Sequence, residues 1–286
     1  MRSNQGVLFV LPAILVLAIL VAYPIVYTGI LSVTDQTGEY VGLKNYAAMA
    51  KARVTTQAVR NTVYYVFGSI VLQVTLGTLT GILLNREFRG RALVRSMALI
   101  PWVVPGIVAA TTWAWMFHTE FGIINYMLTA SHVVDAPVGW LTDRNTVMPA
   151  MIAINGWKLF PFVAVMVLAG LQTVPNELYE SARVDGASFW DEVRHVMLPS
   201  IRPVLVAITL LLLIWGLNAI TIIYTITRGG PANRTLITPI QIFRQAFELF
   251  QFNQAAALSV MFFAVAIVFV AVYIVAFGRS KAERAT

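Results

Sequence analysis

The chain alternates between long stretches without charged residues and shorter stretches rich in charged and turn-forming residues. The uncharged stretches lie between Arg2 and Asp35, Arg60 and Arg86, Arg95 and Glu120, Arg202 and Arg228, and Glu248 and Arg279. Each can supply the roughly 20 apolar residues with which a helix crosses a hydrocarbon core about 30 Å thick. With the apolar segment around Lys158, the pattern predicts six spans: Val7–Val33, Asn61–Leu84, Ser96–Phe117, Val147–Gln172, Pro203–Thr227 and Ala255–Gly278.

The composition agrees with this pattern. Of 286 residues, 58% are hydrophobic and only 12% are charged, and the mean hydropathy is +0.75. Since a soluble domain carries about 25% charged residues, this chain has too few polar side chains to cover a water-exposed globule. The net charge of +7 arises from basic residues beside apolar spans, which indicates membrane anchoring rather than nucleic-acid binding. We therefore predict an all-α, polytopic membrane protein with the lipid bilayer as its surroundings.

Basic residues at the span ends predict the orientation of the chain. One side carries eleven of them in short segments: Arg2, Arg86, Arg89, Arg91, Arg95, Arg183, Arg194, Arg202, Arg279, Lys281 and Arg284. The other side carries eight, spread over longer loops: Lys44, Lys51, Arg53, Arg60, Arg144, Arg228, Arg234 and Arg244. Because dense positive charge marks the cytoplasmic side, we expect both termini and the loop around Glu180 to be cytoplasmic. The charge-free stretch of 32 residues after Arg2 is longer than the apolar region of a signal peptide and predicts a retained span.

A charged loop between the fourth and fifth spans predicts two short helices. Pro175 is suited to a first helical turn, Leu178–Asp185 favour helix, and Gly186 is a suitable stop. Ser188 followed by Asp191 resembles a capping box that opens the second helix. The loop is larger than a simple reconnection requires, so either a docking element for another protein or an amphipathic elbow at the membrane surface fits it.

The side chains of this loop suggest how a partner would contact it. Ala182 and Gly186 lie four residues apart on one face, where small side chains allow close approach. Glu180 and Arg183 lie three residues apart, a spacing that predicts an ion pair. Phe189 and Trp190 follow as apolar anchors.

The loop resembles the EAA loop of importer-type ATP-binding-cassette (ABC) permeases. The positions that match that pattern are Glu180, Ala182, Gly186, Leu198 and Pro199. Ser181 replaces an alanine, Val196 an isoleucine, and Val193 a common aromatic residue. Matches to the carbohydrate (MalF-like, binding-protein-dependent) branch extend along the chain: Asn85–Arg86, Gly90–Arg91, Arg95, Pro101, Pro105, Trp113, Trp115, Gly122–Asn125, Gly229–Pro231, Phe247 and Ala255–Ala257. Asn253–Gln254 departs from it.

The resemblance implies a single transmembrane permease domain over residues 1–286, with a coupling loop at about residues 173–203. It implies that the loop forms a coupling helix seated in a cytosolic ATPase, with contacts from Glu180, Ala182, Arg183, Asp185, Gly186, Leu198 and Pro199. The implied partners are a second homologous permease, two ABC ATPase subunits and an extracytoplasmic substrate-binding protein. The implied location is the plasma (inner) membrane of a prokaryote.

We expect ATP binding and hydrolysis to take place on a partner subunit and not on this chain. It contains no G-x-x-x-x-G-K-[ST] phosphate-binding loop, so ATP and Mg would bind on the partner ATPase and this chain would hold no cofactor. It has no Cys, and its three His residues, at positions 118, 132 and 195, are too dispersed for a metal site. We predict a non-enzymatic subunit with no catalytic residue.

Polar and aromatic residues inside the predicted spans are candidates for the substrate pathway: Gln73, Trp113, Asn155, Trp157, Lys158 and Asn218. An ionisable group at the depth of Lys158 costs a few kcal/mol on insertion scales, so it should face a cavity or a partner, unless it snorkels to the interface. Polar side chains such as Gln73 and Asn218 also commonly form interhelical hydrogen bonds. Trp113 fits either sugar stacking or the aromatic belt.

A self-sufficient secondary transporter or channel is the rival hypothesis. Such a protein would show paired interrupted spans or buried carboxylates for ion coupling. No Asp or Glu lies in any predicted span, which disfavours ion coupling. The substrate implied by the resemblance is a sugar or sugar derivative; disaccharides, amino sugars and glycerophosphodiesters all remain open.

Overall fold

A computed structural model describes residues 3–278 of the chain, in which the regular elements are helices joined by loops and one isolated bridge, Thr34 to Tyr40. The basic residues Arg2, Arg279, Lys281 and Arg284, used above to predict orientation, lie outside the described residues. The chain divides into two compact units. One joins Met1–Gln57 to Thr238–Phe269, and the other joins Ala58–Ile237 to Val270–Thr286.

Five helical segments are long and apolar enough to cross a membrane: Val10–Ser32, Arg53–Asn85, Val147–Leu171, Arg202–Ile226 and Phe252–Phe277. They correspond to five of the six predicted spans. The fourth agrees most closely, since helix α8 runs from Val147 to Leu171. Helix α4 begins at Arg53, earlier than the predicted Asn61, because its first turns are polar and carry no apolar signal. A sixth span is present if a sharply bent helix pair is counted as one.

The first unit contains the following elements: α1 (Ser3–Leu17), the π-helical turn η1 (Ala18–Ala22), α2 (Tyr23–Ser32), α3 (Lys44–Lys51), the start of α4 (Arg53–Asn85), α14 (Thr238–Phe243), η3 (Arg244–Glu248) and most of α15 (Phe252–Gly278). Its polar hub is Asn253. The Asn253 side-chain amide donates hydrogen bonds to the carbonyl oxygens of Leu31 and Asp35, at 3.1 and 3.0 Å. The departure from the carbohydrate-branch pattern at this position therefore joins α15 to the end of α2.

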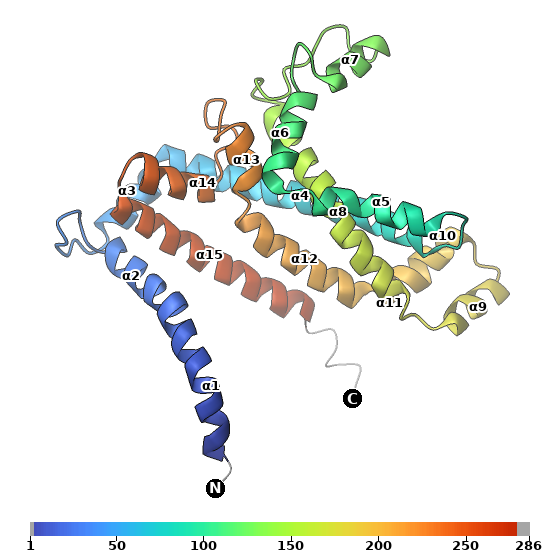
Figure 1. The fold of residues 1–286 in the computed structure, drawn as a ribbon, viewed down its shortest axis with the longest axis horizontal. Coiled ribbons are helices and arrows are strands. Elements are labelled where there is room, and N and C mark those ends of the chain that lie inside the picture. The colour runs from blue at the N-terminus through green and yellow to red at the C-terminus, as the bar shows by residue number, and fades with distance from the viewer. Residues whose placement is uncertain (1–2, 279–286) are drawn as a thin grey trace. The chain divides into compact units, whose positions relative to one another are not determined.

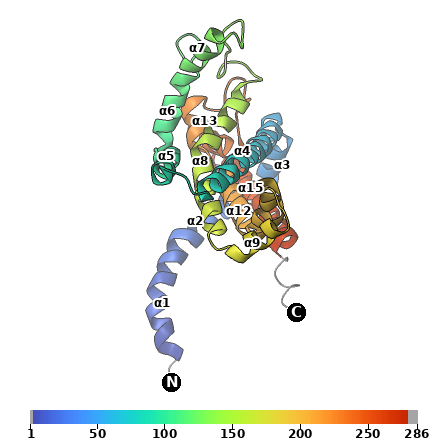
Figure 2. The same ribbon diagram turned by 90° about the vertical axis from the view of Figure 1, so that its right-hand side faces the viewer.

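The second unit contains most of α4, followed by α5 (Arg91–Val103), α6 (Gly106–Met116), α7 (Ile123–Ala130), α8 (Val147–Leu171), α9 (Asn176–Val184), α10 (Phe189–Asp191), η2 (Glu192–Met197), α11 (Leu198–Ser200), α12 (Arg202–Leu217) and α13 (Thr221–Ile226). Helix α4 lies beside α8 in both views (Figures 1 and 2). Glycines permit this close packing. A Cβ added at Gly77 would lie 2.3 Å from the Cβ of Val163 and 2.8 Å from the carbonyl oxygen of Phe160.

The third predicted span, Ser96–Phe117, corresponds to two helices joined by a sharp bend. Helices α5 and α6 meet at an angle of 95° across a two-residue break (Figure 1). Pro105 causes the break, because a proline disfavours helical backbone in the residue before it and has no N–H to donate. Val104 accordingly adopts φ −59° and ψ 128°. A milder break, at residues 218–220, separates α12 from α13 within the fifth span.

Candidate functional site

The loop between α8 and α12 forms the two predicted helical segments. Helix α9 ends in a Schellman motif, in which the Ala187 N–H bonds the Ala182 carbonyl at 2.9 Å and the Gly186 N–H bonds the Arg183 carbonyl at 3.0 Å. The motif needs a left-handed residue, and Gly186 has φ +83°. The second segment is longer than predicted, because α10 continues through η2 and α11 to the start of α12.

The predicted capping box at the start of α10 is confirmed. The Ser188 N–H donates to the Asp191 carboxylate at 3.0 Å, and the Asp191 N–H donates to the Ser188 hydroxyl at 3.4 Å. The Ser188 hydroxyl also donates to this carboxylate at 2.5 Å, and this bond is the main cause that lowers the pKa of Asp191.

The lowered pKa of Asp191 predicts how the second segment responds to acid. A carboxyl whose pKa is lower in the folded protein stabilises it above the unfolded pKa and loses that effect as the pH falls. The box should therefore be intact at neutral pH and loosen only below about pH 3.8, the ordinary value for Asp. Hydrogen exchange of the Asp191 amide against pH measures this. In Asp191→Asn the same amide should be less protected at neutral pH and show no acid transition; a protection factor of the Asp191 amide, corrected for the intrinsic pH dependence of exchange, that does not change with pH would contradict the prediction.

The predicted ion pair between Arg183 and Glu180 is wrong. Arg183 Nε instead donates to Glu192 Oε1 at 2.7 Å, and this bond raises the pKa of Arg183. Glu192 is nearly buried, with 9% of its side chain exposed, whereas Arg183 is 64% exposed. The turn at Gly186 brings η2 back along α9, and the sequence spacing of Glu180 and Arg183 does not reveal that return.

The Arg183–Glu192 pair should hold the two helical segments of the loop at a defined angle. Arg183→Met and Glu192→Gln should each lower the protection of the loop amides against hydrogen exchange, and the double variant should lose little more than either single one, because both remove one interaction. Hydrogen exchange measured over this double-mutant cycle checks the coupling. Additive losses would mean that the two side chains act independently. The effect should be modest, because Arg183 is largely exposed to solvent.

The loop presents apolar side chains to its surroundings. No residue of α9 is buried. On α9, Val184 is 87% exposed and Leu178 48%, and on α10 Trp190 is 68% exposed. Of the predicted coupling residues, Glu180, Arg183, Asp185, Gly186 and Pro199 are exposed, while Ala182 and Leu198 are half-buried. The sequence analysis did not include Val184 among the candidate contact residues. An apolar residue at the end of a polar helix was the available signal.

Phe189, predicted as an anchor for a partner, contacts this chain instead. The Arg86 guanidinium lies over its ring, 4.4 Å from the centroid, and so connects the end of α4 to α10. A polar hollow of about 530 Å³ opens beside this contact, with Tyr179, Glu180 and Glu192 among its lining residues. Trp190 is left as the exposed anchor.

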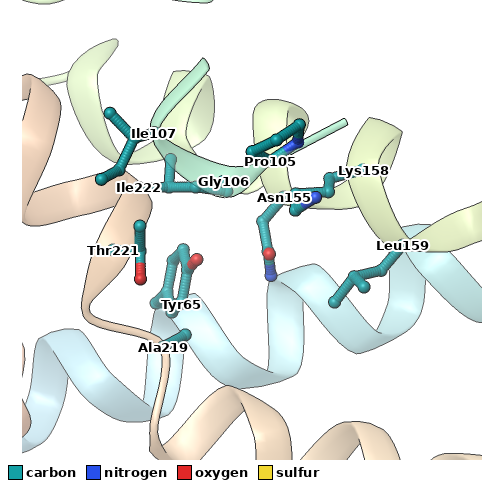
Figure 3. A pocket seen from close by; sticks show the side chains of 10 residues that line it. All are labelled: Tyr65, Pro105, Gly106, Ile107, Asn155, Lys158, Leu159, Ala219, Thr221 and Ile222. Atoms are coloured by element: carbon teal, nitrogen blue, oxygen red, sulfur yellow. The ribbon is translucent and has the colours of Figure 1, made fainter. Parts of the chain in front are cut away.

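A second hollow, of about 500 Å³, lies at the α5–α6 bend (Figure 3). Its lining comes from α4, the bend, α8 and the start of α13: Tyr65, Pro105, Gly106, Ile107, Asn155, Lys158, Leu159, Ala219, Thr221 and Ile222. We call it the bend pocket. Tyr65 is fully buried, and its hydroxyl has no hydrogen-bond partner in the described structure. The sequence analysis did not include Tyr65 among the candidate pathway residues. Its hydroxyl group within a predicted span was the available signal.

The bend pocket contains two of the six predicted pathway residues, Asn155 and Lys158. Gln73 does not line the bend pocket. Its amide donates to the Asn155 carbonyl at 3.3 Å, and its side chain lines a separate small void of about 20 Å³. Trp113 and Trp157 instead pack edge to face, with ring centroids 5.4 Å apart. Asn218 is exposed and bonds the carbonyl of Ile214 in its own helix.

Lys158 points at the bend itself. Its Nζ donates to the Val104 carbonyl oxygen at 2.6 Å. The side chain therefore bonds within the second unit and borders the pocket, as expected for an ionisable group that faces a cavity. Among the described residues, no three His, Asp or Glu side chains gather closely enough to hold a metal ion.

The fold and loop define a multi-pass helical membrane protein with a charged helical loop between two spans. Residues 73–280 match the family described as the binding-protein-dependent transport system inner membrane component. The chain belongs to this family and is a permease subunit of an ABC importer. The rival hypothesis of a self-sufficient secondary transporter or channel finds no support in this match.

Relatives match almost the whole chain. It is 33% identical over 278 residues to the trehalose/maltose transport system permease protein MalF of Thermococcus litoralis, covering 96% of this chain and 93% of that protein. It is 31% identical to the sulfoquinovosyl glycerol transport system permease protein SmoG of Agrobacterium fabrum, covering 94% and 89%. This chain is also similar in fold to a chain of a solved bacterial ABC transporter involved in the import of the acidic polysaccharide alginate. The TM-score is 0.85 and the identity 22%, and the match covers 98% of this chain and 97% of that one.

Proposed function

We propose that this chain forms half of the translocation pathway of a carbohydrate importer, beside a second, homologous permease. The observation that carries the proposal is the similarity, over nearly the full length of both chains, to the trehalose/maltose permease of Thermococcus litoralis. The permease for sulfoquinovosyl glycerol supports the same class, because that compound is also a sugar derivative. A sugar or sugar derivative is therefore the proposed substrate. An extracytoplasmic binding protein would deliver it, since the family is binding-protein-dependent.

The loop between α8 and α12 is the proposed coupling element. Two copies of a cytosolic ATPase would bind ATP and Mg and close against each other, and each would hold one permease loop. Helix α9 suits this role because none of its residues is buried and it offers Leu178 and Val184 as apolar contacts, to which α10 adds Trp190. Glu180 and Asp185 would add polar contacts at its surface. We propose on the same ground that the loop and both chain termini are cytoplasmic, and the density of basic residues supports this orientation.

The bend pocket is the proposed site where this subunit touches its substrate. Tyr65 has a buried hydroxyl without a partner, a costly arrangement unless a ligand completes the bond. Asn155 lies buried on the facing helix α8 and offers an amide. Sugar hydroxyl groups both donate and accept hydrogen bonds, so they match these two side chains.

The test of the proposed function is copurification followed by uptake. The tagged chain, purified from native membranes in mild detergent, should retain an ABC ATPase and a second permease identifiable by mass spectrometry. Reconstituted with these partners and their binding protein, it should take up labelled trehalose, maltose or another sugar only with ATP. Recovery of the chain without any ATPase, or ion-gradient-driven uptake by the chain alone, would overturn the proposal.

Tyr65→Phe should weaken transport without disturbing assembly. The change removes one hydroxyl and leaves the ring in place, so it should cost about 0.5–1.5 kcal/mol of substrate interaction, roughly a twofold to tenfold rise in half-saturating substrate. Tyr64→Phe is the matched control, because Tyr64 is 53% exposed on the same helix and lies outside the pocket. Equal effects of the two substitutions on uptake would remove Tyr65 from the substrate site.

A further inference from the structure

The bend between α5 and α6 interrupts the hydrogen-bond ladder of an apolar helix pair that together is long enough to count as one span. Pro105 has no N–H to donate, and Val104 leaves the helical conformation with ψ 128°. Carbonyl groups at such a break need another donor, because the hydrocarbon region contains no water to replace the lost bonds. The Val104 carbonyl oxygen lies at the C-terminal end of α5, where the helix dipole concentrates negative partial charge.

Lys158 supplies that donor from a different span. It lies near the middle of α8, 54 residues along the chain from Val104, and its Nζ donates to the Val104 carbonyl oxygen at 2.6 Å. A positively charged donor at a helix C-terminus is stabilised both by the hydrogen bond and by the dipole. The ion pairs of the described residues do not include Lys158, and none of the residues lining the bend pocket is acidic. The ammonium group is therefore directed at the bend rather than at a carboxylate.

The bend shapes one wall of the bend pocket. Pro105, Gly106 and Ile107 face the cavity (Figure 3), and Gly106 lies so close to Thr221 of α13 that an added Cβ would be 3.2 Å from the Thr221 methyl carbon. The bend is thus packed against α13 on one side and bonded to α8 on the other. Helix α8 in turn ends at Leu171, and four residues separate it from α9, which begins at Asn176.

We propose that Lys158 is a positioning residue that clamps the α5–α6 bend to α8. A displacement of α9 that tilts α8 would, through this clamp, move the wall of the bend pocket. The proposal rests on the proposed function only where it links this movement to transport. The clamp itself is a property of the chain and can be tested without substrate.

Spin-label distances test the clamp directly. The chain contains no Cys, so paired Cys substitutions introduce labels without background. Leu93 on α5 and Trp115 on α6 are 60% and 75% exposed, and a label pair there reports the bend angle in the assembled transporter in nanodiscs. Lys158→Met should lose the wild-type distance peak in favour of a broad distribution, whereas Lys158→Arg should retain it. Loss of the peak in Lys158→Met, with its retention in Lys158→Arg, supports the clamp.

A second label pair keeps the test interpretable. Val63 and Leu79 are 51% and 47% exposed on the continuous helix α4, so their distance should be the same in all three proteins if the fold is intact. A wild-type distance between Leu93 and Trp115 in Lys158→Met would overturn the proposal.

ATP hydrolysis separates the clamp from a direct substrate contact. Lys158→Met should still assemble with the ATPase but lose the stimulation of hydrolysis by sugar-loaded binding protein, and Lys158→Arg should restore it. A variant that only raised the half-saturating sugar concentration, with bend distances unchanged, would make Lys158 a substrate ligand and not a clamp. Failure of the proposed function would leave the distance result standing, since that measurement needs no transport.

Discussion

Replacing Gly186 with Trp is expected to abolish sugar uptake and to separate the permease from its ATPase, while the chain still inserts into the membrane. Gly186 has φ +83°, so any side chain there strains the turn that ends α9. The space around it is open within the chain, so the indole would project outward, where the ATPase is proposed to contact α9. Uptake in proteoliposomes and ATPase recovery with the tagged permease measure the two effects.

Gly90→Trp is the matched control for this variant. Gly90 has φ +84° and nothing within 4 Å of an added Cβ, so the substitution brings the same backbone strain and the same bulk to the neighbouring α4–α5 loop. It should lower stability to a similar degree and retain the ATPase. Transport that survives in Gly186→Trp, or equal loss of the ATPase in both variants, would refute the docking role of α9.

Gly77→Ala is expected to destabilise the protein, although alanine is the better helix former by about 1 kcal/mol. The added Cβ would lie 2.3 Å from the Cβ of Val163 and 2.8 Å from the carbonyl oxygen of Phe160. Neither atom lies at the end of a flexible side chain, so α4 and α8 must move apart. Overpacking of this kind typically costs about 1–3 kcal/mol. Because this helix pair carries both the bend pocket and Lys158, uptake should fall together with stability.

Thermal unfolding of the detergent-solubilised transporter measures the effect of Gly77→Ala. Gly68→Ala on the same helix is the matched control, because its closest contact would be the terminal Cδ1 of Ile152, at 2.7 Å, which can rotate away. The control should be nearly neutral, and the Gly77 variant should unfold at a clearly lower temperature. Equal unfolding temperatures would show that the α4–α8 contact tolerates separation.

Local sequence patterns predicted much of the protein correctly. The limits of α8, the stop at Gly186 and the capping box of Ser188 and Asp191 all depend on residues within a few positions of one another. Span length is likewise a local property, since the hydrocarbon thickness alone requires an apolar run of a certain length. The EAA spacing indicated the family for the same reason, because one continuous loop carries all its residues.

The errors concern contacts and angles between segments. The charge-free length predicted the span at Ser96–Phe117 but not the 95° bend within it. Arg183 has a near neighbour at the right spacing in Glu180, but its partner is Glu192, which the Gly186 turn brings close. Helical spacing predicts which residues are neighbours on one helix, but it does not predict which later segment the chain folds back against that helix.

By itself, the sequence determined the class of protein, five of its long apolar helices and the position of the helical loop between the fourth and fifth predicted spans. Only the tertiary structure decided that Lys158 bonds the Val104 carbonyl, that Tyr65 is buried at the bend pocket, and that Asn218 is exposed and not among the residues that line it. The physical reason is the distance along the chain over which each property is set. Helix formation and membrane insertion depend on short stretches of chain, whereas a pocket depends on which side chains of distant helices meet, and packing of the whole unit sets that.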